Sequence, residues 1–341
     1  QCHRRGALDE AHGVGRQILA INPKHWQTLV LMGIVSGQRG QDGVALQHFK
    51  AAVKIQPGSP AVQLNLGEAY RRLGQTKAAV SAFKRAISIQ PQNDHAHNNL
   101  GVAFREMDDL ESAIRHFRKA TRLNPENIDS LGNLANVLLE NRVFDEAAAL
   151  YGRLAGFDPA NPSIRLRHGT ALLAQGNGAA ARGALEEAIR LDPKLSHGHD
   201  MLASIAQQDG DLELAIRHYE TALALDPKFA RAHSNLGNTY VTCGLLDDAG
   251  TCFIRALELD PAMASTYDLL LYWLNYSSKV TMDEIAAAYA SWRKHVVEAI
   301  PAMSHPRPGK ESGTRRLRIG YVSPDFRDHV MARFILPLLE N

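Results

Sequence analysis

Small and large apolar side chains recur along this chain with a period of 34 residues between residues 26 and 263. When each period is counted from Trp26, position 20 is alanine in all seven periods and position 27 is alanine in six. Position 24 is large, aromatic in six periods and Leu185 in the other. Small residues let two helices approach closely, and a large residue fills the space beside them. The pattern predicts seven copies of one helical unit.

Proline marks the boundaries between these units. Eight prolines follow one another at intervals of 34 residues, and each is preceded by a polar residue. They are Pro23, Pro57, Pro91, Pro125, Pro159, Pro193, Pro227 and Pro261. A residue before proline is disfavoured in the helical region, so the second helix of each unit should end there. We also expect several of the polar side chains to cap the next helix, with proline in its first turn.

A period of 34 residues, with only glycine or alanine at position 8, is typical of tetratricopeptide repeats, in which each repeat is a pair of helices. We predict a partial repeat over residues 1–25 and seven full repeats over residues 26–263. Such pairs stack into an all-α, right-handed superhelix whose concave groove is lined by the first helices. Binding of a protein or peptide in that groove is the expected function.

Asparagine recurs at position 6 of the first helix in four of the seven repeats. These residues are Asn65, Asn99, Asn133 and Asn235. Asparagine is a poor helix former, so its recurrence inside a helix needs a reason. A side-chain amide can donate to and accept from a peptide backbone at the same time. We therefore predict that the four asparagines bind peptide; the alternative is that they satisfy neighbouring groups of the protein itself.

The histidines do not predict a metal site. His95 and His97, like His197 and His199, are two residues apart and so point to different faces of a helix. Three other histidines share position 23, beside the large residue of the second helix, and we interpret them as recurring surface residues. They are His48, His116 and His218.

Charge and cysteine content give little indication of a partner. The 341 residues include 38 basic and 36 acidic side chains, a balance that gives no reason to expect nucleic acid or an anionic membrane surface. No apolar run reaches the roughly 18 residues needed to cross a bilayer. Three cysteines without zinc spacing favour the cytoplasm, and no metal or cofactor is predicted. The chain begins at Gln1 inside a helix of the repeat register, which indicates a piece of a longer protein.

The repeat pattern ends after Pro261. Residues 264–300 are predicted to form capping and connector helices. Residues 301–314 concentrate proline, glycine and serine, which is typical of a linker. Residues 315–341 then predict the first strand and helix of an α/β domain that is truncated at the end of the chain.

The stretch RLRIGYVSPDFRDH, residues 316–329, resembles the start of the catalytic region in O-linked N-acetylglucosamine transferases and their SPINDLY-like relatives. The resemblance implies a Rossmann-like glycosyltransferase fold, UDP-N-acetylglucosamine (UDP-GlcNAc) as donor substrate, and Ser or Thr of proteins as acceptors. It also implies an active-site position for His329, which matches the histidine of the D-F-x-x-H motif. The role of that histidine is left open.

The leading hypothesis from the sequence is the N-terminal, substrate-binding part of a protein O-glycosyltransferase, which by itself would not catalyse the reaction. One alternative is a non-catalytic tetratricopeptide scaffold or adaptor. Another is a related transferase that uses a different nucleotide sugar, such as GDP-fucose. Protein or peptide acceptors in the groove are the expected partners, and a homodimer is compatible with the sequence.

Overall fold

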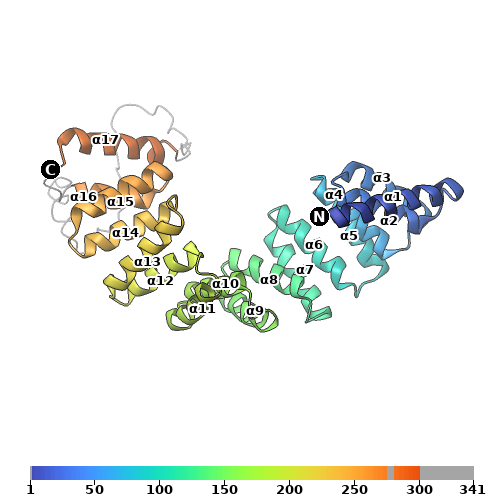
Figure 1. Cartoon of the computed structure of the whole chain (residues 1–341), viewed down its shortest axis with the longest axis horizontal. Coiled ribbons are helices and arrows are strands. Elements are labelled where there is room, and N and C mark those ends of the chain that lie inside the picture. The colour runs from blue at the N-terminus through green and yellow to red at the C-terminus, as the bar shows by residue number, and fades with distance from the viewer. Residues whose placement is uncertain (1, 275–279, 300–341) are drawn as a thin grey trace, which may run out of the picture. The chain divides into compact units, whose positions relative to one another are not determined.

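The computed structural model describes residues 2–274 and 280–299, which form seventeen α-helices and one π-helical turn (Figure 1). Within these two ranges there is no β-strand. The predicted linker at residues 301–314 and the predicted α/β start at residues 315–341, His329 included, lie outside the described residues. The described chain is all-α, as the repeat pattern predicts.

Each repeat is a pair of helices. The first helices are α2 (Trp26–Gln38), α4 (Pro60–Arg72), α6 (Asp94–Glu106), α8 (Ile128–Glu140), α10 (Pro162–Ala174), α12 (Ser196–Gln208) and α14 (Ala230–Thr242). The second helices are α3 (Asp42–Ile55), α5 (Thr76–Ile89), α7 (Leu110–Leu123), α9 (Phe144–Phe157), α11 (Gly178–Leu191), α13 (Leu212–Leu225) and α15 (Leu246–Leu259). The first pair is preceded by α1 (Cys2–Ile21), and the last is followed by α16 (Ala264–Leu274), α17 (Met282–Trp292) and the π-helical turn η1 (Arg293–Val297).

The small and large positions meet inside each pair. In the third repeat, a Cβ atom at Gly101 would lie 2.7 Å from the ring of Phe117, and that ring is fully buried. Ala113 and Ala120 flank Phe117 on the same helix and are also fully buried. The predicted packing of a small residue at position 8 against a large residue at position 24 is confirmed. A larger residue at position 8 would push the two helices apart.

The prolines lie in the turns between repeats, which corrects the expectation that they begin the next helix. In the second repeat, α4 begins three residues after Pro57, and its N-cap is Ser59, whose side chain accepts a hydrogen bond from the Val62 amide. The polar residue before proline ends the second helix as predicted. The side chain of the residue before proline does not cap the following helix. Asp192, which precedes Pro193, shows its role: it accepts a hydrogen bond from the Lys194 amide at 3.0 Å and so closes the turn.

The fourth repeat departs from the others. Its second helix, α9, packs as closely on α10 of the next repeat as on its own partner α8, whereas the other second helices pack mainly on their own first helix. Leu154 replaces alanine at position 27 here and is buried. The larger side chain explains why α9 packs less closely on α8 than the other second helices pack on their own first helices, because it occupies the space through which alanine allows close approach.

Candidate functional site on the first helices

The first helices of neighbouring repeats contact one another as well as their own partners. Such contacts join α2, α4, α6 and α8, and also α12, α14 and α16. We call the surface formed by these helices the first-helix wall. Position 6 of the repeat, where the sequence predicts peptide-binding asparagines, lies along these contacts. All four asparagines are half-buried.

Asn65 and Asn99 line one cavity between α4 and α6. The cavity has a volume of about 360 Å³. Its other lining residues are Leu64, Glu68, Arg71 and Val102. Asn65 also lines a second cavity, of about 170 Å³, between α2 and α4. Neither side-chain amide forms a hydrogen bond with another residue in the described part of the chain, so both donors and both acceptors remain for a ligand.

Arg71 forms ion pairs with two carboxylates beside this cavity. Its guanidinium lies 2.7 Å from the carboxylate of Glu68 on the same helix and also pairs with Glu106 on α6. The hydrogen bond with Glu68 raises the pKa of Arg71, against the effect of partial burial. The cavity therefore combines two amides with an ion-paired arginine and carboxylate, a set suited to a peptide backbone and polar side chains.

Asn133 and Asn235 are engaged within the protein. The Asn133 amide donates to Asn98 Oδ1 at 3.0 Å, and the Asn235 amide donates to Asp200 Oδ1 at 3.3 Å. In both cases the acceptor is at position 5 of the preceding repeat. For these two residues the alternative interpretation, satisfaction of neighbouring groups, fits the contacts of the amide nitrogen. The four predicted residues therefore divide into two pairs with different surroundings.

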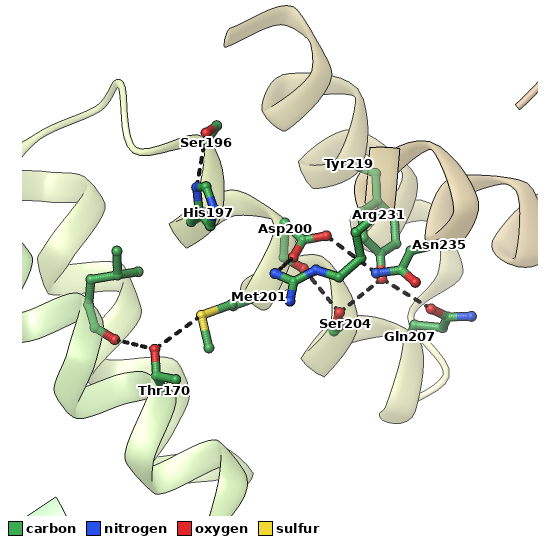
Figure 2. Close-up of polar contacts among 11 residues, drawn as sticks. Thr170, Ser196, His197, Asp200, Met201, Ser204, Gln207, Tyr219, Arg231 and Asn235 are labelled. Carbon is green, nitrogen blue, oxygen red and sulfur yellow. Dashed lines mark hydrogen bonds and ion pairs between the residues drawn. The ribbon is translucent and has the colours of Figure 1, made fainter. Parts of the chain in front are cut away.

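Asp200 is the centre of the contact between α12 and α14. Its carboxylate is 1% exposed and accepts from Arg231 at 2.6 Å as well as from Asn235. Figure 2 shows Arg231 and Asn235 reaching Asp200 from α14. The Arg231 guanidinium also lies over the ring of Phe229, with 5.3 Å between the guanidinium carbon and the ring centroid. A buried carboxylate needs such partners, so this cluster fastens the sixth repeat to the seventh.

Sequence reasoning missed Asn98 and Asp200. The signal that could have found them is a separation of 35 residues between a polar residue at position 5 and an asparagine at position 6 of the next repeat. Neither residue stands out within its own repeat.

Two tyrosines connect the second helices to this wall. The Tyr219 hydroxyl lies 3.0 Å from Ser204 Oγ and donates to Gln207 at 3.2 Å, as Figure 2 shows. Tyr151 donates to Asn136 at 2.5 Å in the same way. Burial raises the pKa of Tyr219 to about 12, so the hydroxyl stays protonated at neutral pH. Both tyrosines fill the large position of their repeat and also orient a polar residue at position 9.

Two histidine couples correct the interpretation of position 23 as a surface position. Nδ1 of His97 lies 3.1 Å from Nδ1 of His116, and the same atoms of His199 and His218 are 3.1 Å apart. His97 Nε2 lies 3.2 Å from the Pro91 carbonyl oxygen, which can only accept, so Nε2 carries the hydrogen. In the neutral couple, His97 Nδ1 is therefore the acceptor and His116 Nδ1 the donor. Burial, together with the neighbouring His97, lowers the pKa of His116 to about 4.

These couples do not form a metal centre. Among the residues that the structure describes, no group of three or more His, Cys, Asp or Glu side chains could hold a metal ion. The same described residues contain no helix that is both long and apolar enough to cross a membrane.

Comparison with known protein families concerns the repeats. Residues 4–211 match the family described as the cilia and flagella-associated protein 70 C-terminal domain. The chain belongs to this family. Residues 207–244 match a TPR repeat family, and residues 230–263 match a tetratricopeptide repeat family, so the repeats continue beyond the first match. Tetratricopeptide repeats in general present surfaces that bind other proteins or peptides.

Known proteins and structures that are similar to the chain share its repeats. Over 83 residues it is 37% identical to the TPR repeat-containing thioredoxin TTL4 of Arabidopsis thaliana, a match that covers 24% of the chain and 12% of that protein. A tetratricopeptide repeat protein from Parabacteroides merdae is 18% identical, with a TM-score of 0.52, over 73% of the chain and 99% of that structure.

The Cut9–Hcn1 hetero-tetramer of the APC/C is 17% identical, with a TM-score of 0.51, over 78% of the chain and 53% of the matched structure. Identities this low show the fold alone.

Proposed function

We propose that this chain is a protein-binding scaffold that holds an extended segment of a partner against α4 and α6 of the first-helix wall. The observation that carries the proposal is the pair of amides, Asn65 and Asn99, which line one cavity and have no hydrogen-bond partner among the described residues. Neither amide is shut off from water, so a bound backbone would replace water at two positions that already point hydrogen-bonding groups outward.

The two amides give a form of recognition that tolerates different sequences. A carboxamide can accept from one backbone N–H and donate to one backbone C=O, so two of them hold an extended segment without reading its side chains. Glu68 and Arg71 stand beside them, already paired with each other at 2.7 Å. These charges favour partners with polar side chains near the bound backbone.

The test begins with a displayed library of random linear peptides captured by the whole chain. The affinity of a selected peptide is then measured by isothermal titration for the double variant Asn65→Ala, Asn99→Ala. Loss of two to four hydrogen bonds of about 1 kcal/mol each predicts an affinity that is weaker by roughly 30-fold or more. The matched control is Asn133→Ala, Asn235→Ala, whose amides are already engaged. Equal affinity for the first double variant and the natural chain would refute the proposal.

Partners are expected among proteins or peptides. The family description names cilia and flagella, so proteins of these organelles form the first panel to screen. We keep the cytoplasm as the proposed location, and a second copy of the chain remains one partner to test by sedimentation at several concentrations. Neither nucleic acid nor a membrane surface is proposed, because the charge is balanced at +2.

A second candidate function is protein O-glycosylation. It rests on residues 316–329, which resemble the start of a catalytic region and lie outside the described residues. In this proposal the wall presents acceptor proteins, and His329 takes an active-site position. A protein that joins this chain to a complete catalytic region should then transfer radiolabelled sugar from UDP-GlcNAc or GDP-fucose to proteins, and His329→Ala should abolish the transfer. A protein that binds partners but transfers neither sugar would leave the scaffold as the better account.

A further inference from the structure

The last helical pair, α16 and α17, breaks the packing rule of the other pairs. The fourth and eleventh residues of every earlier second helix are alanine, apart from Leu154; in α17 they are Ile285 and Trp292. The eighth residue of every earlier first helix is glycine or alanine, whereas in α16 it is Leu271. Larger residues on both sides keep two helices apart. Accordingly, α17 packs less closely on α16 than the helices of the earlier pairs pack on each other.

The separation leaves a cavity of about 420 Å³ between α15, α16 and α17. Its walls are mostly apolar, with Leu257 on α15, Leu270 and Trp273 on α16, and Ala287 on α17. Val280, before α17, also lines it. A volume of about 300 to 1,000 Å³, apolar walls and a few polar groups are the usual features of a ligand pocket. The cavity is therefore large enough for one or two apolar side chains of a partner.

The polar groups of this cavity are mainly acceptors. His295 Nδ1 lies 3.1 Å from the carbonyl oxygen of Ser291, so Nδ1 carries the hydrogen and Nε2 is left as an acceptor. Nε2 bonds to none of the described residues. Tyr267, Ser291 and His295 form one hydrogen-bonded cluster at this wall of the cavity, with both hydroxyls 3.3 Å or less from a neighbour in the cluster.

Two carboxylates add to the acceptors. Glu258 and Glu284 line the cavity, and its lining contains neither lysine nor arginine. Glu284 also closes the capping box of α17 with Thr281, and Glu258 forms an exposed ion pair with Arg255 at 2.8 Å. An exposed pair of this kind is weak, so the carboxylate can exchange Arg255 for a cation of a ligand. His295 itself lies in the π-helical turn η1, a rare geometry that often marks a functional site.

We propose that this cavity binds a partner-protein segment in which large apolar side chains are followed directly by lysine or arginine. The apolar side chains enter the space between α16 and α17, and the cation meets Glu258, Glu284 and the Nε2 acceptor of His295. This site is separate from the α4–α6 surface and carries its own specificity: it reads an apolar and basic sequence, whereas the amides of Asn65 and Asn99 read backbone. Each site can therefore fail its test without the other.

The probe is a fluorescein-labelled peptide, Gly-Ser-Phe-Leu-Arg-Lys-Ser-Gly, titrated with the whole chain and followed by fluorescence anisotropy. In two comparison peptides, Glu-Glu replaces Arg-Lys, or Ser-Ser replaces Phe-Leu. Each change should weaken binding by about tenfold or more, since each removes one of the two classes of contact. Equal binding of the acidic peptide, or no measurable binding of the apolar and basic peptide, would overturn the proposal.

The matched variants are Ala287→Trp, which fills the cavity, and Ala286→Trp, which adds the same side chain to the neighbouring exposed residue outside it. The first should weaken binding of the basic peptide by about tenfold or more, and the second should change it by less than about twofold. Circular dichroism checks that both variants keep their helices. The variant Asn65→Ala, Asn99→Ala should bind this peptide normally; if it does not, the peptide binds at α4 and α6 and the proposed site is wrong.

Discussion

Asparagine at position 6 has two different surroundings in this chain. On α8 and α14 its amide donates to a polar residue at position 5 of the preceding repeat, namely Asn98 or Asp200. On α4 and α6 the preceding position 5 holds Val30 or Leu64. Valine and leucine cannot accept a hydrogen bond, so the amides there keep their hydrogen-bonding capacity. The neighbouring repeat thus decides whether the same residue fastens the array or remains available for a partner.

This comparison gives a physical reason for the position of the proposed binding surface. Repeats of one fold share the positions that pack each helical pair, but the contact between repeats differs from one junction to the next. At the junction of α12 and α14 a buried carboxylate is satisfied by two side chains. At the junction of α4 and α6 a cavity of about 360 Å³ is left instead. These two kinds of junction should therefore respond differently to substitution.

The largest effect is expected where the α12–α14 junction is broken. Arg231→Leu would leave Asp200, which is 1% exposed, with Asn235 as its one remaining side-chain partner at this junction. A buried carboxylate that loses its cation costs about 3–5 kcal/mol, but the Arg231 side chain is 55% exposed, so the free energy of unfolding should fall by a smaller amount, about 2–4 kcal/mol. Urea unfolding followed by circular dichroism measures it. Arg217→Leu is the control, because Arg217 pairs loosely with Glu213 at 3.6 Å on an exposed face. Equal midpoints for the two variants would contradict the assigned role of Asp200.

The two repeats that supply the acceptors also contain the histidine couples, which makes them sensitive to acid. Burial lowers the pKa of His116 to about 4 and also lowers the pKa of His97, His199 and His218. The unfolded chain, with histidine pKa values near 6.5, therefore binds more protons than the folded chain at intermediate pH. Stability from the couples is fully present above about pH 6.5 and is lost as the pH falls towards 4.

After a discount for partial exposure, this loss should amount to about 1–2 kcal/mol between pH 7 and pH 5. Urea midpoints measured across that range check it. His116→Phe together with His218→Phe should flatten the dependence, whereas His95→Phe, at an exposed residue outside the couples, should leave it steep. A dependence that is unchanged in the double variant would show that other groups cause it.

A smaller difference should separate single asparagine variants of the two kinds. Asn133→Ala leaves the Asn98 oxygen without its donor, whereas Asn99→Ala removes no hydrogen bond within the described chain. Both gain the better helix propensity of alanine, so that contribution cancels. The free energy of unfolding should differ between the two variants by about 1 kcal/mol, with Asn133→Ala the less stable. If Asn99→Ala were equally destabilising, its amide would have a structural role that the contacts do not show.

The helical pairs could be predicted from the sequence. Gly101, Ala113 and Phe117 meet inside one repeat, and residues of the same size stand at the equivalent positions every 34 residues. Whether the amide of each asparagine is engaged within the protein could not be predicted, because that depends on a residue 35 positions earlier in a different repeat. The histidine couples cannot be predicted for a related reason: His97 and His116 are 19 residues apart on two different helices, and spacing within one helix does not pair them.

The smallest effect on stability, and the most direct test of the comparison, is expected from converting one kind of junction into the other. Asn98→Leu gives α6 the residue that α4 has at position 5, Leu64. The lost hydrogen bond to Asn133 is offset by burial of an apolar side chain where Asn98 is 9% exposed, so stability should change by less than about 0.5 kcal/mol.

The readout is the side-chain amide of Asn133 in NMR hydrogen exchange. In the natural chain it should exchange more slowly than that of Asn65, because it donates to Asn98 at 3.0 Å. In Asn98→Leu the two rates should become similar, and Asn235, at the distant junction, should keep its protection as an internal control. Continued protection of Asn133 would mean that something other than position 5 of the preceding repeat holds it, and the rule drawn from these two junctions would fail.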